Sequence, residues 1–375
     1  MFRQKVRRIL RCLIRELRYC RGFGHLFESC PGANLNNAVL TDVRSGGING
    51  SPIALPSNWQ LASGYLIGPG ADLSSAILSY ENLTDANLTG ATLNGARLVG
   101  ANLTGANLAG ADLGIETWTN WKTVLTGANL TDVISGGITG SPSALPDNWQ
   151  LASGYLIGPR AYLDGANLTG ANLSDVNLAN ANLHKAALDD ADLGGANLTD
   201  ANLSGVSSGG ITGNPGSLPA TWQLISGYLI GPGANLGGAD LSGANLYKAD
   251  LDYADLRFAN LSNANLNWAD LSGANLYKAF LSNADLANAD LYKANLTGAS
   301  LADAVLIGAS FSYGTILFDG QTVLEHGFDA ASLKNYLVES QYTSNATNLT
   351  IVPEPTTLLL ALLALVAAPL RVRCG

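Results

Sequence analysis

The chain has 375 residues, of which 43 are glycine, three are histidine, four are cysteine and only 13% are charged. So little histidine and cysteine leaves almost no material for a histidine-rich metal site, a redox relay or a disulfide scaffold. The formal charge of −9 is unevenly divided, because residues 1–30 carry +6 and residues 31–350 carry −16. An acidic body disfavours nucleic acid as a direct partner, since phosphate recognition depends on lysine and arginine.

Residues 1–30 form a basic N-terminal segment. Val6, Leu10 and Leu13 follow helical spacing with arginines between them, which predicts an amphipathic helix suited to an anionic membrane surface. We expect no secretory signal here, because no long apolar run follows the charges. We also expect no metal site, because the spacing matches no usual zinc motif for the four candidate ligands Cys12, Cys20, His25 and Cys30.

A five-residue period dominates the rest of the chain. Leucine recurs at every fifth position in 73–113, 163–203 and 236–306, almost always preceded by alanine at two positions before it and by Asn or Asp at one. A five-residue step advances a helix by about 140°, which would scatter the leucines around its circumference. A flat strand would alternate them between its faces. Only a chain that turns a corner after each unit directs every leucine inward.

Four such corners close a coil of twenty residues, which stacks on the next coil about 4.8 Å away. Leucine then fills the interior, and the small alanine lets the walls approach. The motif Ala-(Asp/Asn)-Leu-x-x, as in Ala101-Asn102-Leu103, resembles the signature of pentapeptide-repeat proteins. The resemblance implies an all-β fold, a right-handed quadrilateral β-helix, over residues 31–318. Disorder is disfavoured, because disordered chains lack a strictly placed apolar residue.

Glu81 departs from the pattern, because it stands where alanine usually points inward. A carboxylate in an apolar interior is costly unless it is paired. Either Glu81 marks a buried site, or a neighbouring insertion deforms the coil and lets the side chain reach water.

Three related insertions interrupt the repeat, at 43–70, 133–160 and 206–233. In the first, two short apolar runs flank Ala62-Ser63-Gly64, which predicts a β-hairpin standing as a wing on the solenoid wall. Each copy carries a tryptophan that could form a carbohydrate platform or pack on a tyrosine of the same copy. The three pairs are Trp59 and Tyr65, Trp149 and Tyr155, and Trp222 and Tyr228.

Residues 319–350 are predicted to close the solenoid. Asp329 is a plausible N-cap, and Leu333 and Leu337 follow on one face of a helix that would cap the open interior. A polar linker then leads to the C-terminal tail.

The tail, residues 352–375, has three parts. Pro353-Glu354-Pro355 precedes an apolar run at 356–370, and Arg371 and Arg373 follow it. This order resembles the PEP-CTERM sorting signal of exported bacterial proteins. The resemblance implies recognition and removal of the tail by an exosortase-type membrane protease, with Pro353, Glu354, Pro355, Arg371 and Arg373 as the processing signal. The apolar run would hold the chain transiently in the membrane.

No catalytic constellation appears in the sequence, so we expect no enzyme and no cofactor. His184 and His326 stand in unrelated contexts, every cysteine lies outside the repeat, and most Asp residues occupy positions that Asn also occupies. We therefore expect an exported structural or interaction protein of the cell surface or extracellular matrix. Its expected partners are the protease and extracellular polysaccharide or other surface proteins. The alternative is a cytoplasmic DNA mimic, like those pentapeptide-repeat proteins that bind a type II topoisomerase.

The twenty-residue coil predicts which residues lie one above another. Residues twenty apart should share a wall, and their side chains should make cation–π contacts between coils. The expected pairs are Lys248 with Trp268, Arg257 with Tyr277, and Phe258 with Lys278. We also expect Leu266→Asp to be severely destabilising and Asn267→Asp to be nearly silent.

Overall fold

The computed structural model describes residues 34–113, 123–138, 140–306, 308–310 and 323–324. These residues form strands, bridges and turns, and no helix occurs among them. The chain divides into two compact units. One takes the residues up to Ala186 together with Ala191–Asn202 and Gly213–Pro219, and the other takes Ala187–Asp190, Leu203–Thr212 and the chain from Ala220.

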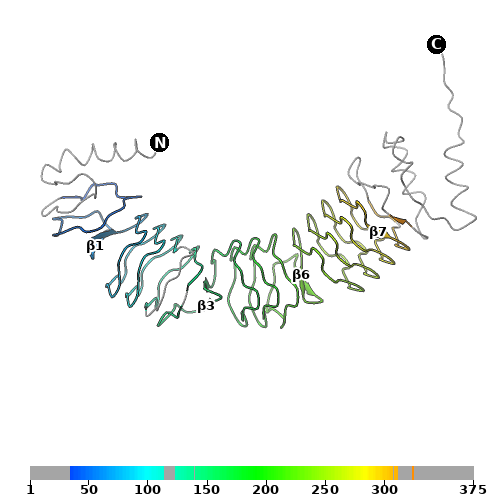
Figure 1. Cartoon of the computed structure of the whole chain (residues 1–375), viewed down its shortest axis with the longest axis horizontal. Helices are drawn as coiled ribbons and strands as arrows, with labels where there is room; N and C mark the ends of the chain where they lie inside the picture. The colour runs from blue at the N-terminus through cyan, green and yellow to red at the C-terminus, as the bar shows by residue number, and fades with distance from the viewer. Residues whose placement is uncertain (1–33, 114–122, 139, 307, 311–322, 325–375) are drawn as a thin grey trace, which may run out of the picture. The chain divides into compact units, whose positions relative to one another are not determined.

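Within each unit the chain winds in stacked coils (Figure 1). Parallel bridges join residues twenty positions apart, for example Asn87 to Asn107 in the first unit and Asn245 to Asn265 in the second. Each coil thus contains four five-residue units, which confirms the predicted coil length. Around the segment 114–122 the step is 22 residues, as between Asn102 and Val124.

Leucine and alanine fill the interior as the sequence predicts. Between residues 234 and 306, every leucine of the repeat is at most 1% exposed, and every alanine two positions before such a leucine is at most 5% exposed. Burying one leucine side chain contributes roughly 1.5–3 kcal/mol, so this column of side chains is the main source of stability.

The five-residue unit satisfies its own backbone donors, as residues 254–258 illustrate. The first two amides donate to the carbonyls of Leu251 and Ala234, and the third and fifth donate to those of Asn275 and Tyr277. The fourth amide is accepted by the side-chain Oδ1 of the unit's own Asp, at 3.2 Å. The Asn or Asp before each leucine therefore closes an Asx turn, and either residue suffices because only the oxygen is needed.

Between residues 234 and 306, each corner places the last residue of its unit in the left-handed region. The amide after this residue donates to the preceding leucine carbonyl, as Ala259 does to Leu256, so the corner is a type II turn. Glycine is the natural choice there, yet Phe258 and Trp268 adopt φ values of 60° and 59°. Bulky residues in this conformation cost about 1 kcal/mol or more each.

The three predicted hairpins are present. Strand β1 (Gln60–Ala62) pairs with β2 (Tyr65–Ile67), β3 (Gln150–Ala152) with β4 (Tyr155–Ile157), and β5 (Gln223–Ile225) with β6 (Tyr228–Ile230), each time antiparallel. In the first hairpin Ser63 and Gly64 both have positive φ, which is a two-residue type I′ turn. Across each hairpin the bridged residues are 28 positions apart, as with Ser207 and Asn235, so each insertion adds eight residues to a coil.

The hairpins are not external wings, and that expectation is wrong. The leucine and isoleucine of β2, β4 and β6 are at most 1% exposed. In the third copy the Leu229 amide donates to Ser208 Oγ at 2.9 Å, and the Ile211 amide donates to the Gly227 carbonyl at 3.1 Å. The hairpin packs into the solenoid because its leucine and isoleucine side chains are buried there and its backbone groups form hydrogen bonds there.

One further strand pair lies at the end of the described chain. Strand β7 (Ser300–Leu301) pairs in parallel with β8 (Val323–Leu324). The predicted N-terminal helix in 1–30, the capping helix at 329–337 and the tail at 352–375 lie outside the described residues.

We predict that Leu266→Asp lowers the free energy of unfolding by about 3–5 kcal/mol, because it places an uncompensated charge among stacked leucines. Leu266 is fully buried. Thermal and denaturant unfolding followed by circular dichroism would measure the loss.

The matched control is Asn263→Asp, since Asn263 is exposed and has a φ of 60°, which Asp adopts at Asp303. The Asn267→Asp control expected from the sequence is unsuitable, because Asn267 Nδ2 donates to the Asp285 carboxylate at 3.3 Å. Equal losses for Leu266→Asp and Asn263→Asp would contradict a continuous leucine core.

Candidate functional site

The third hairpin separates two coils that would otherwise pair. On one wall Ser207 bridges Asn235, but beyond the next corner the hairpin tip occupies the space between Ile211 and Asp240. The Asp240 amide donates to the hydroxyl oxygen of Tyr228 at 3.2 Å. The second copy repeats this bond, from the Asn167 amide to Tyr155, at 3.2 Å. In the second and third insertions the tyrosine hydroxyl therefore takes the place of the neighbouring coil as the partner of this amide.

The hairpin tryptophans are structural, so the carbohydrate-platform interpretation is wrong. Trp222 is 8% exposed, and Trp59 and Trp149 are half-buried. Trp222 packs on Gly231, where a Cβ would overlap the six-membered ring. The tyrosine partner that the sequence suggests lies instead against a different glycine, because a Cβ on Gly209 would be 3.1 Å from the Tyr228 ring.

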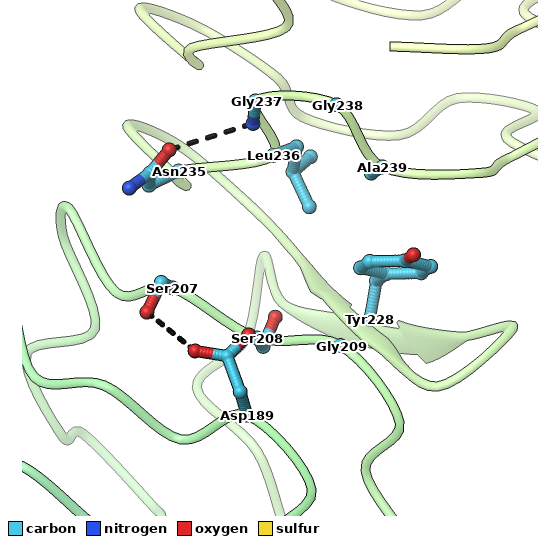
Figure 2. A pocket seen from close by; sticks show the side chains of 10 residues that line it. All are labelled: Asp189, Ser207, Ser208, Gly209, Tyr228, Asn235, Leu236, Gly237, Gly238 and Ala239. Atoms are coloured by element: carbon cyan, nitrogen blue, oxygen red, sulfur yellow. Dashed lines mark hydrogen bonds between the residues drawn. The ribbon is translucent and has the colours of Figure 1, made fainter. Parts of the chain in front are cut away.

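A pocket of about 220 Å³ opens beside the third hairpin. Figure 2 shows that its lining comes from three successive levels of the second unit together with the start of β6. The lining residues are Asp189, Ser207, Ser208, Gly209, Tyr228, Asn235, Leu236, Gly237, Gly238 and Ala239. We call this the third-hairpin pocket.

The pocket is hollow because the outward corner positions above Asp189 carry no side chains. Gly209 and Gly237 stand there on the following two coils. Two hydrogen bonds orient its polar groups (Figure 2): Ser207 Oγ donates to Asp189 at 2.9 Å, and Asn235 Oδ1 accepts the Gly237 amide at 3.4 Å. The result is a small polar depression beside an aromatic ring.

The second copy lacks this arrangement. Tyr162 and Asp164 occupy the positions of Asn235 and Gly237, and the Tyr162 hydroxyl donates to Asp164 at 3.3 Å. Asp164 also contacts His184 Nδ1 at 2.8 Å, and this hydrogen bond lowers the pKa of Asp164. The site residues of the third copy escaped the sequence analysis, although a residue-by-residue comparison of the three insertions would have revealed the difference.

The corner that holds the pocket continues with aromatic and basic side chains. Asn235 bridges Asp255, which bridges Asn275, so Arg257 and Tyr277 follow Gly237 along the same corner. Burial alone would raise the pKa of Asp255, but the hydrogen bonds and charge of Arg257 lower it. The two side chains are joined at 2.6 Å.

The predicted register is confirmed, but the predicted cation–π partners are wrong. Residues twenty apart are bridged, yet Lys248 lies over the ring of its own neighbour Tyr247, at 5.1 Å, and not over Trp268. Lys278 and Lys293 likewise lie over the tyrosines that precede them, at 5.1 and 5.0 Å. Arg257 pairs with Asp255, and Phe258 makes an edge-to-face contact with Tyr277 at 5.6 Å.

Exposed aromatic residues gather in the second unit. Of the large exposed apolar side chains among the described residues, six fall between positions 247 and 292. They are Tyr247, Tyr253, Phe258, Trp268, Phe280 and Tyr292. Such a concentration on an outer surface is typical of interaction sites.

One wall of the second unit carries a column of carboxylates. Asp250 bridges Asp270, and Asp270 bridges Asp290. Burial raises the pKa of nearby Asp252, and the charges of Asp270, Asp250 and Asp290 raise it further. The wall therefore has a locally negative potential.

Glu81 is not a buried site. It is half-buried and accepts a hydrogen bond from Ser63 Oγ at the tip of the first hairpin. The side chain reaches water in part, as the second interpretation expects, but the coil is not deformed there, because the Asn102 amide still donates to the Glu81 carbonyl at 2.9 Å.

The predicted processing residues Pro353, Glu354, Pro355, Arg371 and Arg373 lie outside the described residues, as do Cys12, Cys20, His25 and Cys30. Within the described residues no group of three His, Cys, Asp or Glu side chains is placed to hold a metal ion. The described part of the chain also contains no helical segment with the length and apolar character that a bilayer crossing needs.

The repeat identifies the family. A family model described as pentapeptide repeats matches residues 69–105, 82–114, 160–195, 177–207, 233–267, 264–303 and 284–314. The chain belongs to the pentapeptide-repeat proteins. Proteins of this family are in general structural or interaction proteins. No curated protein sequence matches the chain significantly.

Several solved structures resemble parts of the chain. HetL, a pentapeptide-repeat protein involved in the regulation of heterocyst differentiation in the cyanobacterium Nostoc, is 30% identical over 64% of this chain and 84% of its own, with a TM-score of 0.23. A pentapeptide-repeat protein of the Arabidopsis thaliana thylakoid lumen is 36% identical over 23% of this chain and 70% of its own, with a TM-score of 0.16. QnrB1, a plasmid-mediated fluoroquinolone resistance protein, is 15% identical over 63% of this chain and 91% of its own, with a TM-score of 0.19. With TM-scores this low, the family assignment depends on the repeat sequence.

We predict that Gly231→Ala destabilises the chain by about 1–3 kcal/mol, because its methyl group would overlap the Trp222 ring in a packed site. Gly237→Ala is the matched control, since a Cβ there meets its nearest atom at an ordinary 3.5 Å. Thermal unfolding of both variants tests this packing, and an equally large loss for Gly237→Ala would contradict it.

We also predict that Asp252→Asn stabilises the chain at pH 7. The folded-state pKa of Asp252 lies above its unfolded value, so the folded chain binds more protons in the window between them and stability falls as the pH rises through it. Removing the carboxylate should raise the free energy of unfolding at pH 7 by about 0.5 kcal/mol after allowing for solvent screening, and this gain should vanish near about pH 3.

Asp240→Asn should change the stability at pH 7 in the opposite direction and destabilise the chain. A hydrogen bond from Ser242 lowers the pKa of Asp240, so its stabilisation is present above the unfolded pKa and is lost on acidification through the lower folded value. Unfolding midpoints measured across pH would separate the two, and a gain at pH 7 for Asp240→Asn but not Asp252→Asn would overturn the assignment.

Proposed function

We propose that the protein is an exported, non-enzymatic interaction scaffold displayed at the cell surface or in the extracellular matrix. The observation that carries the scaffold role is the division between interior and surface. Leucine and alanine fill the interior, so the outer walls and corners remain for recognition. On them the exposed aromatics of the second unit lie among the lysines and aspartates of the same coils.

A rigid repeated surface suits this role. Each coil advances the outward positions by about 4.8 Å, so side chains at one corner form a regular row. We further infer that the coil is four-sided, since twenty residues contain four units that each end in a turn. The resemblance to pentapeptide-repeat proteins implies that it is right-handed.

Export is inferred from the tail alone. Pro353-Glu354-Pro355, the apolar run at 356–370 and the two terminal arginines have the order of an exosortase-type sorting signal. Under this proposal the apolar run holds the chain in the membrane, Arg371 and Arg373 keep its end on the cytoplasmic side, and a protease cuts near Pro353.

A second candidate function has one observation in its favour. The aligned carboxylates of Asp250, Asp270 and Asp290 provide a repeated negative wall, as a protein that mimics DNA for a type II topoisomerase would need. Lys248 and Lys293 lie beside tyrosines on the same coils and reduce the net charge there.

Intact mass of the native protein, measured in separated cell fractions, tests the export proposal. We expect the wild-type chain outside the cytoplasm without residues 356–375. A variant with Pro353→Ala, Glu354→Gln and Pro355→Ala should keep its tail and stay with the membrane. Pro219→Ala is the control for proline loss elsewhere and should be processed normally.

A wild-type chain that resides in the cytosol with residues 356–375 intact would contradict export. A supercoiling assay with a type II topoisomerase would then decide for the second candidate if the protein inhibits the enzyme.

A further inference from the structure

We propose that the third-hairpin pocket binds one unit of a neutral glycan, with the rest of the glycan running along the corner that continues through Phe258 and Tyr277. This inference deepens the interaction role proposed above by naming the site and the class of ligand.

The size of the pocket limits the ligand. Pockets for cofactors and drug-sized ligands usually enclose about 300–1,000 Å³ and are mostly apolar. The third-hairpin pocket measures about 220 Å³ and is lined by a carboxylate, an amide and hydroxyls. A single small polar unit fits this space, and a nucleotide does not.

The polar groups match a polyhydroxylated ligand. The Asp189 carboxylate only accepts hydrogen bonds, and the Ser207 hydroxyl, which donates its hydrogen to Asp189, offers its oxygen as a further acceptor. The Tyr228 hydroxyl accepts the Asp240 amide and keeps its hydrogen as a donor. Asn235 uses Oδ1 for the Gly237 amide, and its amide nitrogen supplies donors. Sugar hydroxyls both donate and accept, so this mixture can satisfy several of them at once. The ring of Tyr228 adds an apolar face for the C–H groups of the sugar.

The distribution of charge favours a neutral ligand. Asp189 lies at one end of the pocket and repels anionic sugars and phosphates. Arg257 and Lys278 lie further along the same corner and repel a cationic chain. A glycan that crosses both regions avoids electrostatic repulsion from either one only if it carries no charge.

The corner offers further stacking sites beyond the pocket. Positions 237, 257 and 277 follow one another at steps of about 4.8 Å, because their walls are bridged coil by coil. Phe258 is 51% exposed and is supported edge-to-face by Tyr277. An extended glycan leaving the pocket would therefore meet an aromatic side chain on the next coil.

The chain itself supplies a matched variant that closes the pocket. Asn235→Tyr with Gly237→Asp copies the second hairpin, in which Tyr162 and Asp164 stand at these positions in the same fold. Gly237 does not have a positive φ, and a Cβ there has room. The double variant should fold with an unchanged circular dichroism spectrum.

Titration calorimetry of the full-length chain tests the proposal. The probes are the neutral hexasaccharides maltohexaose, cellohexaose and mannohexaose, with hexagalacturonate and a chitosan hexamer as charged probes. We expect one neutral probe to bind at least about tenfold more tightly than either charged probe. The double variant should weaken this binding at least about tenfold, and Ser207→Ala about threefold, because they remove hydrogen bonds to the ligand.

Two more variants locate the glycan. Phe258→Asn should weaken binding of the hexasaccharide several-fold but leave binding of the matching disaccharide unchanged. Asn is chosen because it already occupies the same turn position at Asn263. Phe280→Asn is the control, because Phe280 is exposed on another wall, where Asn260 precedes it in register. It should bind like the wild type.

Binding that survives the double variant, tighter binding of a charged probe, or no binding of any neutral probe at millimolar concentration would overturn the proposal. None of these results alters the intact-mass outcome, so failure of the glycan site and failure of the export proposal are distinguishable.

Discussion

The structure depends on one constraint, that a five-residue unit must satisfy its backbone donors without a helix or a long strand. Three of its amides pair with other coils, one closes the turn, and the last is accepted by the Asn or Asp side chain of the unit itself. This arrangement keeps the chain turning after every leucine. The leucine interior follows, because each unit then returns to the same orientation.

The insertions show how much disturbance this scheme tolerates. Eight extra residues form a hairpin that bonds to the serine and isoleucine of its own insertion, so the parted coils keep partners for their backbone groups. The tryptophan covers the glycine where the hairpin rejoins the coil. The pocket lies beside the corner where the hairpin tip takes the place of the neighbouring coil, so the Asp240 amide pairs with the Tyr228 hydroxyl. A candidate recognition site is thus a by-product of the way the hairpin is accommodated.

The sequence predicted the features set by periodicity and missed those set by local competition. The leucine period was sufficient to predict the twenty-residue coil, and Ser63-Gly64 the first hairpin turn. The leucine period could not show that Lys248 contacts Tyr247 and not Trp268, because the register allows both contacts. The contact with the sequence neighbour Tyr247 costs less conformational entropy. The interchange of Asn and Asp argued against catalysis but did not reveal that the side-chain oxygen shared by the two residues closes a turn, as at Asp255 and Asn275. The pocket could not be predicted from the sequence, because the sequence does not show that Gly209 and Gly237 line the same space.

Hydrogen exchange of single amides in 254–258 and its neighbours, followed by NMR, tests this account most directly. The amides of Leu256 and Phe258 donate to the next coil, whereas the Arg257 amide between them is held only by the Asp255 side chain. The account predicts strong protection of Leu256 and Phe258, with faster exchange at Arg257 that accelerates further in Asp255→Ala. Uniform exchange across all three amides, or protection that follows a helical period, would contradict it.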